Sequence, residues 1–129
     1  MGYTRYWNRT SQPITEDFCE AVRKIIEDSK AKGIFIGNGW GEGEPILTLD
    51  TVAFNGDASK ELDHETCYFS NNEDKKGFNF CKTARKPYDY TVREVLKVAE
   101  QMGIITDVRS DGDNEEIISD DEYLTKYGY

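Results

Sequence analysis

The stretch Phe78–Asp89 reads FNFCKTARKPYD and leads directly into a strongly patterned helical segment. Phe78–Cys81 alternates aromatic with smaller residues, which is typical of a strand. Thr91 and Glu94 have the spacing of a capping box, in which each side chain hydrogen-bonds the backbone of the other at the start of a helix. Apolar residues then recur at helical spacing up to a glycine stop, at Val92, Val95, Leu96, Ala99, Met102 and Gly103. The sequence therefore predicts a strand, a basic connection and a helix from Thr91.

A second amphipathic helix is predicted near the N-terminus. A strand over residues 3–8, rich in aromatic residues, ends before Pro13. Thr15 is suited to cap the helix that follows, because acidic residues fill its first turn. The helix has an apolar stripe and a glycine stop, at Phe18, Val22, Ile25, Ile26, Ser29 and Gly33.

Short strand-like runs fill much of the remaining sequence. They cover 34–36, 46–49, 52–54, 66–70 and 104–109, with a turn at 110–113 and a short edge strand at 117–118. This order predicts an α+β fold in which two helices pack on one face of a mainly antiparallel sheet. A ferredoxin-like split β-α-β arrangement with inserted strands is the more specific interpretation. We expect a single domain over 1–129, with an acidic C-terminal tail from about residue 110.

The charge and the cysteines suggest an acidic cytoplasmic protein. The formal net charge is -9 at pH 7, which opposes long-range attraction to polymeric nucleic acid and to anionic membranes. The 3 cysteines form no CxxC pair, and an odd number argues against a disulfide framework. No apolar run is long enough to span a bilayer, and the N-terminus lacks the apolar core of a signal peptide. The sequence leaves the oligomeric state open.

The stretch that follows the Phe78–Cys81 strand is a basic island in this acidic chain, and we interpret it as an anion site. Arginine offers a planar fork to phosphate or carboxylate, lysine a point charge, and tyrosine a ring for stacking. The glycine-rich loop that contains Trp40 lacks the ending of a P-loop, so Trp40 is expected as a mobile flap. The predicted ligand-binding residues are Lys82, Thr83, Arg85, Lys86, Tyr88, Asp89 and Trp40. The expected ligand is an anionic, nucleotide-like small molecule.

The same stretch carries a resemblance. FNFCKTARKPYD looks like the signature of a set of short, functionally uncharacterised proteins of bacteria and their phages. Residues 3–7, 54–56, 65–66 and 110–113 look similar at matching places. The resemblance implies no activity and assigns no role to any residue.

Two alternatives stay open beside the anion site. The acids beyond Ile105 present a negative surface to a basic protein partner, which is typical of an inhibitor or regulator and would fit a phage counter-defence factor. A small nucleotide-acting enzyme would need Cys81, His64 or Glu65 for its chemistry. Zinc binding by His64, Cys67 and Cys81 is disfavoured, because the paired spacing of a zinc site is absent. We therefore assign no catalytic residue, metal or cofactor, and favour a binding protein over an enzyme.

Overall fold

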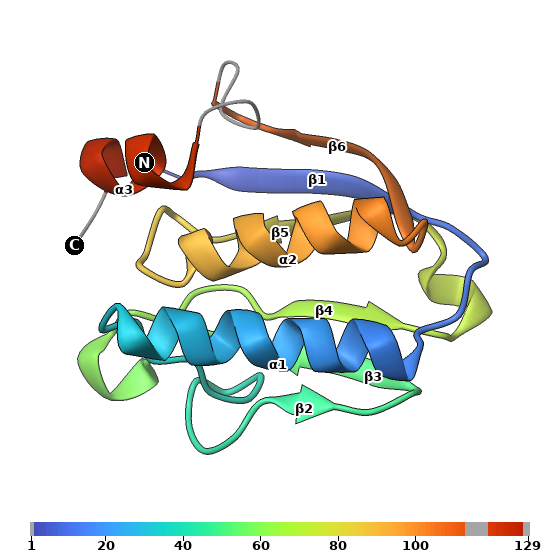
Figure 1. Cartoon of the computed structure of the whole chain (residues 1–129), viewed down its shortest axis with the longest axis horizontal. Helices are drawn as coiled ribbons and strands as arrows, with labels where there is room; N and C mark the ends of the chain where they lie inside the picture. Colours follow the sequence, from blue (N-terminus) through green and yellow to red (C-terminus); the bar gives the residue numbers. More distant parts are fainter. Residues whose placement is uncertain (1, 113–118, 128–129) are drawn as a thin grey trace.

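The computed structural model describes residues 2–112 and 119–127 of the chain (Figure 1). In chain order its elements are β1 (Thr4–Arg9), α1 (Glu16–Ala31), β2 (Ile46–Leu47), β3 (Thr51–Phe54), η1 (Ala58–Lys60), β4 (Cys67–Ser70), η2 (Glu73–Lys75), β5 (Gly77–Lys82), α2 (Asp89–Gln101), β6 (Ile105–Ser110) and α3 (Asp120–Tyr127). The predicted α+β class is confirmed.

The strands form two three-stranded antiparallel sheets, with the orders β5-β1-β6 and β2-β3-β4. Strand β1 runs antiparallel to both of its neighbours, so β5 and β6 are parallel to each other and α2 connects them. This is a split β-α-β unit, with β1 as the inserted strand. The expectation of one continuous sheet is corrected, because β2, β3 and β4 pair among themselves while β5 pairs with β1.

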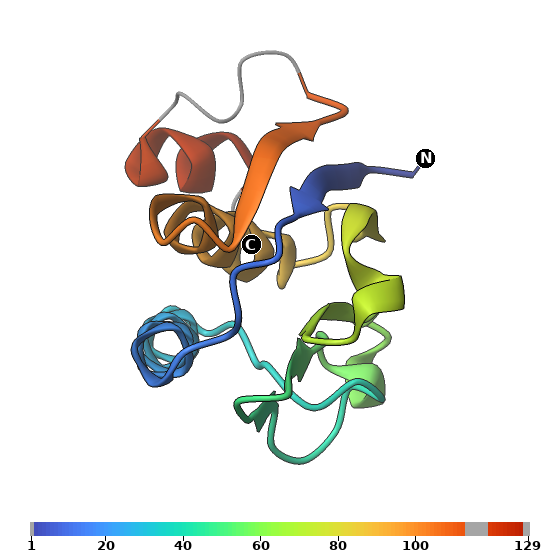
Figure 2. The same cartoon turned by 90° about the vertical axis from the view of Figure 1, so that its right-hand side faces the viewer.

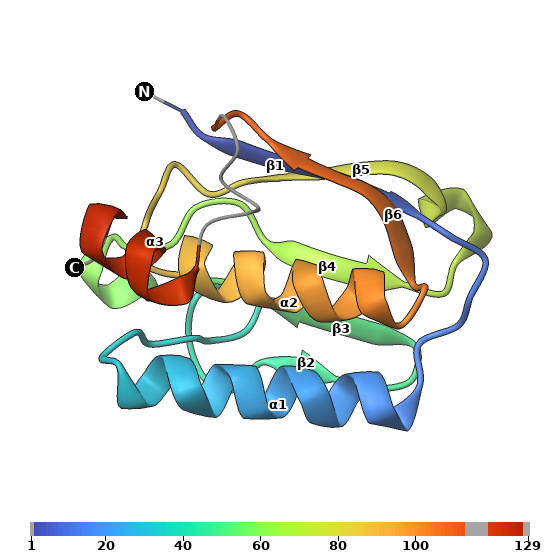
Figure 3. The same cartoon turned by 45° about the horizontal axis from the view of Figure 1, so that its top comes forward.

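The two long helices lie together on one side of the molecule, and the strands lie on the other side (Figure 2). Helices α1 and α2 run side by side in opposite directions (Figures 1 and 3). The core between the layers contains Trp7 of β1, Phe18 of α1 and Phe69 of β4, each at most 1% exposed. The Trp7 and Phe69 ring centroids are 5.6 Å apart, so aromatic packing joins the two sheets.

Helix α1 follows its prediction, but α2 does not start where the capping box suggested. The Thr15 hydroxyl accepts a hydrogen bond from the Phe18 N–H at 3.1 Å, as an N-cap should. In α2 the N-cap is Tyr88, and Thr91 lies inside the helix with its hydroxyl 2.7 Å from that of Ser29. The capping-box prediction is therefore wrong, because a buried contact between α1 and α2 uses the Thr91 side chain.

Two other local predictions need correction or fall outside the described part of the chain. Residues 34–36 were expected to form a strand, but they pair only through an isolated bridge at the next residue, between Gly37 and Asn55. Ile34 and Ile36 are nevertheless buried, so the apolar pattern indicated their burial but not a strand. The edge strand expected at 117–118 and the last residue of the turn at 110–113 lie outside the described residues.

Candidate functional site

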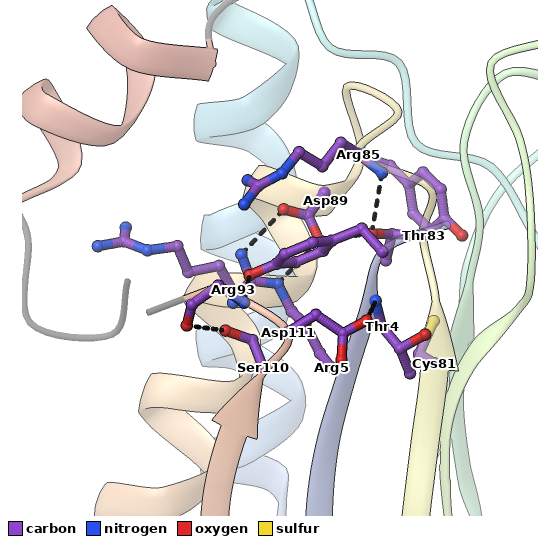
Figure 4. Close-up of polar contacts among 12 residues, drawn as sticks. Thr4, Arg5, Cys81, Thr83, Arg85, Asp89, Arg93, Ser110 and Asp111 are labelled. Carbon is purple, nitrogen blue, oxygen red and sulfur yellow. Dashed lines mark hydrogen bonds and ion pairs between the residues drawn. The ribbon is translucent and has the colours of Figure 1, made fainter. Parts of the chain in front are cut away.

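The predicted ligand-binding stretch divides into a buried half and a surface half, and Asp89 lies at the centre of the buried half. Figure 4 shows Arg5 of β1 and Thr83 directed toward this carboxylate. Arg5 binds it through two hydrogen bonds of 2.8 and 2.9 Å, and the Thr83 hydroxyl donates a third of 2.6 Å. The Tyr123 hydroxyl of α3 donates a fourth. Because all four residues are at most 2% exposed, this network is a structural clamp rather than an open site.

The buried charges of Arg5 and Asp89 stabilise each other. Burial alone would raise the pKa of the Asp89 carboxyl, but the hydrogen bonds and charge of Arg5 outweigh it and hold that pKa below its ordinary value. Removing one partner of a buried pair leaves the other charge uncompensated, which costs about 3–5 kcal/mol. The clamp therefore joins the first strand, the start of α2 and the C-terminal helix.

A tight turn leads from β5 toward this clamp. The Lys86 N–H donates to the Thr83 carbonyl at 3.0 Å, and the two central residues, Ala84 and Arg85, have φ values of 53° and 54°. Two positive φ values define a type I′ turn, which costs about 1–2 kcal/mol per residue without glycine. The N–H groups of Thr83 and Ala84 both donate to the Tyr3 carbonyl, at 2.9 and 3.2 Å. The turn is therefore held in one conformation.

The three predicted cations lie at the surface around this turn, but they do not converge on one point. The Lys82 Nζ lies 5.7 Å from the Phe80 ring centroid. The Arg85 guanidinium stacks 3.7 Å from the centroid of the Tyr3 ring. The Lys86 Nζ donates to the Glu61 carbonyl at 3.1 Å. Only Lys82 belongs to the sheet itself.

The two predicted aromatic residues are placed very differently. Tyr88 is fully buried, and its hydroxyl donates to the Glu65 carbonyl at 2.6 Å, so its side chain is committed to the core. Trp40 is 81% exposed in the glycine-rich loop, where its N–H donates to the Asn38 side chain at 2.8 Å. The structure therefore does not bring Tyr88 or Trp40 to the cations as a stacking platform.

An aromatic platform does exist, on the face of the β5-β1-β6 sheet that points away from α2. Phe78 is 57% and Phe80 45% exposed, whereas the neighbouring Cys81 points inward and is buried. The Tyr6 and Phe78 ring centroids are 6.1 Å apart, and those of Phe78 and Phe80 are 5.9 Å apart. We call this surface, made by Tyr6, Phe78, Phe80, Lys82 and Arg109, the outer face. The opposite side of the sheet, which carries the buried Arg5, Trp7 and Arg9, is the inner face.

The strand register places the members of the outer face together. Tyr6 is directly opposite Phe80 on β5 and Arg109 on β6, and directly paired residues share one face of a sheet. A β-bulge falls between Tyr6 and Asn8, where Asp107 has a φ of 55° and accepts a hydrogen bond of 2.7 Å from the Asn8 side chain. The bulge adds one residue to β6 and sets the position of Arg109 opposite Tyr6.

Cations flank the row of rings at both ends. The Arg109 guanidinium is 5.7 Å from the Tyr6 centroid and 5.9 Å from the Phe78 centroid, while Lys82 lies beside Phe80. The acids near Tyr6 and Asn8 are bound to the sheet, since Asp111 accepts from the Tyr6 hydroxyl at 2.8 Å. The outer face therefore combines ring surfaces, on which bases stack, with two cations, which pair with phosphate.

A pocket of about 280 Å³ lies elsewhere, between the end of α1, the start of α2 and α3. Its lining includes Lys32, Tyr90 and Tyr123. Both Lys32 and the Tyr90 hydroxyl bond Asp28, at 2.8 and 3.4 Å, so these polar groups satisfy one another. The pocket is mainly an apolar hollow beside the clamp.

The thiols and the histidine do not assemble a reactive centre. Cys67 and Cys81 are fully buried, and burial raises the pKa of the Cys67 thiol well above its ordinary value. His64 is exposed. Among the described residues, no group of three or more His, Cys, Asp or Glu side chains is arranged to hold a metal. Within the same part of the chain, no helix has the length and apolar character needed to cross a membrane.

Comparisons with family models, with curated proteins and with solved structures each give no match for this chain. The case for a function therefore rests on the geometry of the residues themselves.

Sequence reasoning missed Tyr6, Phe78, Phe80 and Arg109 as candidate binding residues. The signal was present, because Phe78 and Phe80 are two residues apart and must share one face of a strand. The sequence does not show which face is covered, and alternating aromatic residues usually indicate the buried one.

Proposed function

We propose that the protein binds a nucleotide-like anion on the outer face of the β5-β1-β6 sheet. The observation that carries the proposal is the continuous row of Tyr6, Phe78 and Phe80, with Arg109 at one end and Lys82 at the other. A base stacks on an aromatic ring whatever its identity, and each stacked base contributes about 1–3 kcal/mol. Arginine and lysine then pair with the phosphate.

The buried clamp supports this proposal by fixing the strands. Arg5 lies on the inner face one residue before Tyr6, and its bond to Asp89 ties β1 to the start of α2. A binding surface on a rigid sheet loses little conformational entropy when its ligand arrives. The proposal moves the expected anion site from the stretch at 82–89 to the adjoining sheet, and of the predicted ligand-binding residues it retains Lys82.

Calorimetric titration with adenosine 5′-monophosphate tests the proposal. We expect Phe78→Ala to weaken binding by about 5- to 150-fold, which corresponds to one lost stacking interaction. Phe35→Ala is the matched control, because Phe35 is 40% exposed outside the sheet and its loss should leave binding unchanged.

The double variant Arg85→Ala/Lys86→Ala separates the outer face from the basic turn. These cations lie outside the row of rings, so we expect binding to change less than it does in Phe78→Ala. Binding abolished by the double variant but retained by Phe78→Ala would place the site at the turn. No heat from the wild-type protein at millimolar nucleotide would refute the proposal.

A further inference from the structure

The outer face is long enough to offer more than one base a ring. Its three centroids follow one another at 6.1 and 5.9 Å, from Tyr6 through Phe78 to Phe80. A mononucleotide has one base and would leave most of this row unused. The geometry fits a ligand with several successive bases better than it fits a single nucleotide.

The segment before and within β5 has a recognisable order. Lys76–Phe80 reads KGFNF, which is a basic residue, a glycine and two aromatic residues separated by one position. The base-stacking strand of the RNA-recognition motif begins with this order, and its sheet stacks two or three bases. Asn79, Cys81 and Thr83 depart from the rest of that pattern. The likeness is an analogy of arrangement, so the argument depends on the exposed rings.

Gly77 explains how the strand presents its rings. Its φ is 82°, a conformation that glycine adopts without strain, and it opens β5 immediately before Phe78. Phe78 and Phe80, two residues apart, then both point outward beside Tyr6 of β1. The first strand and the strand before α2 thus contribute neighbouring rings to one surface.

This surface carries acids as well as cations, because Asp111 and Asp107 bond the Tyr6 and Asn8 side chains beside the rings. Lys82 and Arg109 flank the rings, and the Lys75 Nζ lies 5.9 Å from the nearby Tyr68 ring. The net charge of -9 repels a long phosphate polymer at a distance. Recognition should therefore depend mainly on base stacking, with the local cations holding a few phosphates.

These observations point to a single strand rather than a duplex. The bases of a duplex are stacked on one another, so their faces are closed to the Phe78 and Phe80 rings, whereas unpaired bases can be splayed onto aromatic side chains. We infer that the outer face binds a short segment of single-stranded RNA, with successive bases stacked along Tyr6, Phe78 and Phe80. This inference rests on the proposed nucleotide binding and names its ligand class.

Fluorescence anisotropy with a labelled oligouridylate of about eight nucleotides tests the inference. We expect Phe78→Ala and Phe80→Ala each to weaken binding by about 5- to 150-fold, and the double variant to weaken it further. Tyr6→Phe should retain binding, because it keeps the ring and removes only the hydroxyl that bonds Asp111. Phe35→Ala again serves as the control.

The cations are tested by salt dependence. Each phosphate contact contributes a slope of about 0.7 to the fall of log affinity with log salt concentration for a single strand. Lys82→Gln and Arg109→Gln should each reduce the wild-type slope by about that amount. An unchanged slope in both variants would overturn their role at phosphate.

Binding of other ligands, compared with that of the RNA oligomer, tests the choice of a single RNA strand. Equal or tighter binding of the matching oligodeoxynucleotide would overturn the assignment to RNA, and equal binding of duplex RNA would overturn base stacking. Self-association that Phe78→Ala abolishes would identify the face as an interface between two copies and refute the inference. If adenosine 5′-monophosphate binds but the oligomer binds no more tightly, the RNA inference fails and the proposed function stands; if neither ligand binds, both fail.

Discussion

The two faces of the β5-β1-β6 sheet reverse the usual distribution of side chains. The inner face buries two arginines, Arg5 and Arg9, which are 1% and 3% exposed. The outer face exposes Phe78 and Phe80 to solvent. The inner charges are tolerated because each is bonded: Arg5 pairs with Asp89, and Arg9 donates to backbone carbonyls at 2.6–3.2 Å and to Asn71.

The inner face therefore stabilises the fold, whereas the outer face is the proposed binding surface. A buried charge held by several partners fixes the strands, because its removal leaves another charge unpaired. An exposed ring contributes little to stability but offers a surface for a ligand. Substitutions on the two faces should therefore affect different properties of the protein.

The largest expected effect is at Asp89 of α2, the partner of Arg5 on the inner face. Asp89→Asn removes the charge that pairs with Arg5 and should lower the free energy of unfolding by about 3–5 kcal/mol. Urea denaturation measures the change. A loss below about 1 kcal/mol would show that the clamp is not a main support of the fold.

The same pair gives stability a defined pH dependence. The pKa of Asp89 in the folded protein lies below its ordinary value of 3.8, so the stabilisation is fully present above about that pH. It is lost as the pH falls through the lower, folded-state pKa. The difference in unfolding free energy between wild type and Asp89→Asn should thus be constant from neutral pH down to about 4 and shrink below it. A difference that does not shrink in acid would contradict the pairing.

A smaller effect is expected where α1 meets α2. Thr91→Val keeps the shape of the side chain but leaves the buried Ser29 hydroxyl without the partner that lies at 2.7 Å, at a cost of about 1–3 kcal/mol. The double variant Ser29→Ala/Thr91→Val removes both polar groups and should recover part of this loss. A Thr91→Val variant as stable as the wild type would show that the interhelical hydrogen bond contributes nothing.

The smallest expected effect on stability is on the outer face. Phe78→Ala and Phe80→Ala should each change the free energy of unfolding by less than about 1 kcal/mol, because both rings are largely exposed. Phe69→Ala is the matched core control and should cost about 3–5 kcal/mol, since Phe69 is 1% exposed. Comparable losses in both sets would mean that the outer rings are part of the core.

Local patterns predicted the helices better than the contacts between them. The cap at Thr15 and the apolar stripe of α1 depend on neighbouring residues, so the sequence identifies both. The start of α2 depends on Arg5, which lies 84 residues from Asp89 in the chain. The division into two sheets likewise depends on which distant strands pair. Such choices follow from tertiary packing, which overrides local signals.

The candidate site was predicted in part for the same reason. The concentration of Lys82, Arg85 and Lys86 in an acidic chain is visible in the sequence, and in the structure Lys82 is exposed while Arg85 and Lys86 are half-buried. Asp89 and Tyr88 looked like ligand residues, yet the core uses both. The sequence does not show that Phe78 and Phe80 are exposed, because burial of one strand face depends on the position of α2, which residue type does not report.

Residue-resolved nuclear magnetic resonance titration of isotope-labelled protein with oligouridylate tests the separation of the two faces most directly. We predict that the largest amide shifts fall within residues 4–9, 77–82 and 105–110, and that Phe78→Ala needs more ligand to reach the same shifts while the spectrum stays folded. Shifts centred on Tyr90 and Tyr123 in the pocket beside the clamp, or no shifts at any ligand concentration, would contradict the assignment of the outer face as the binding surface.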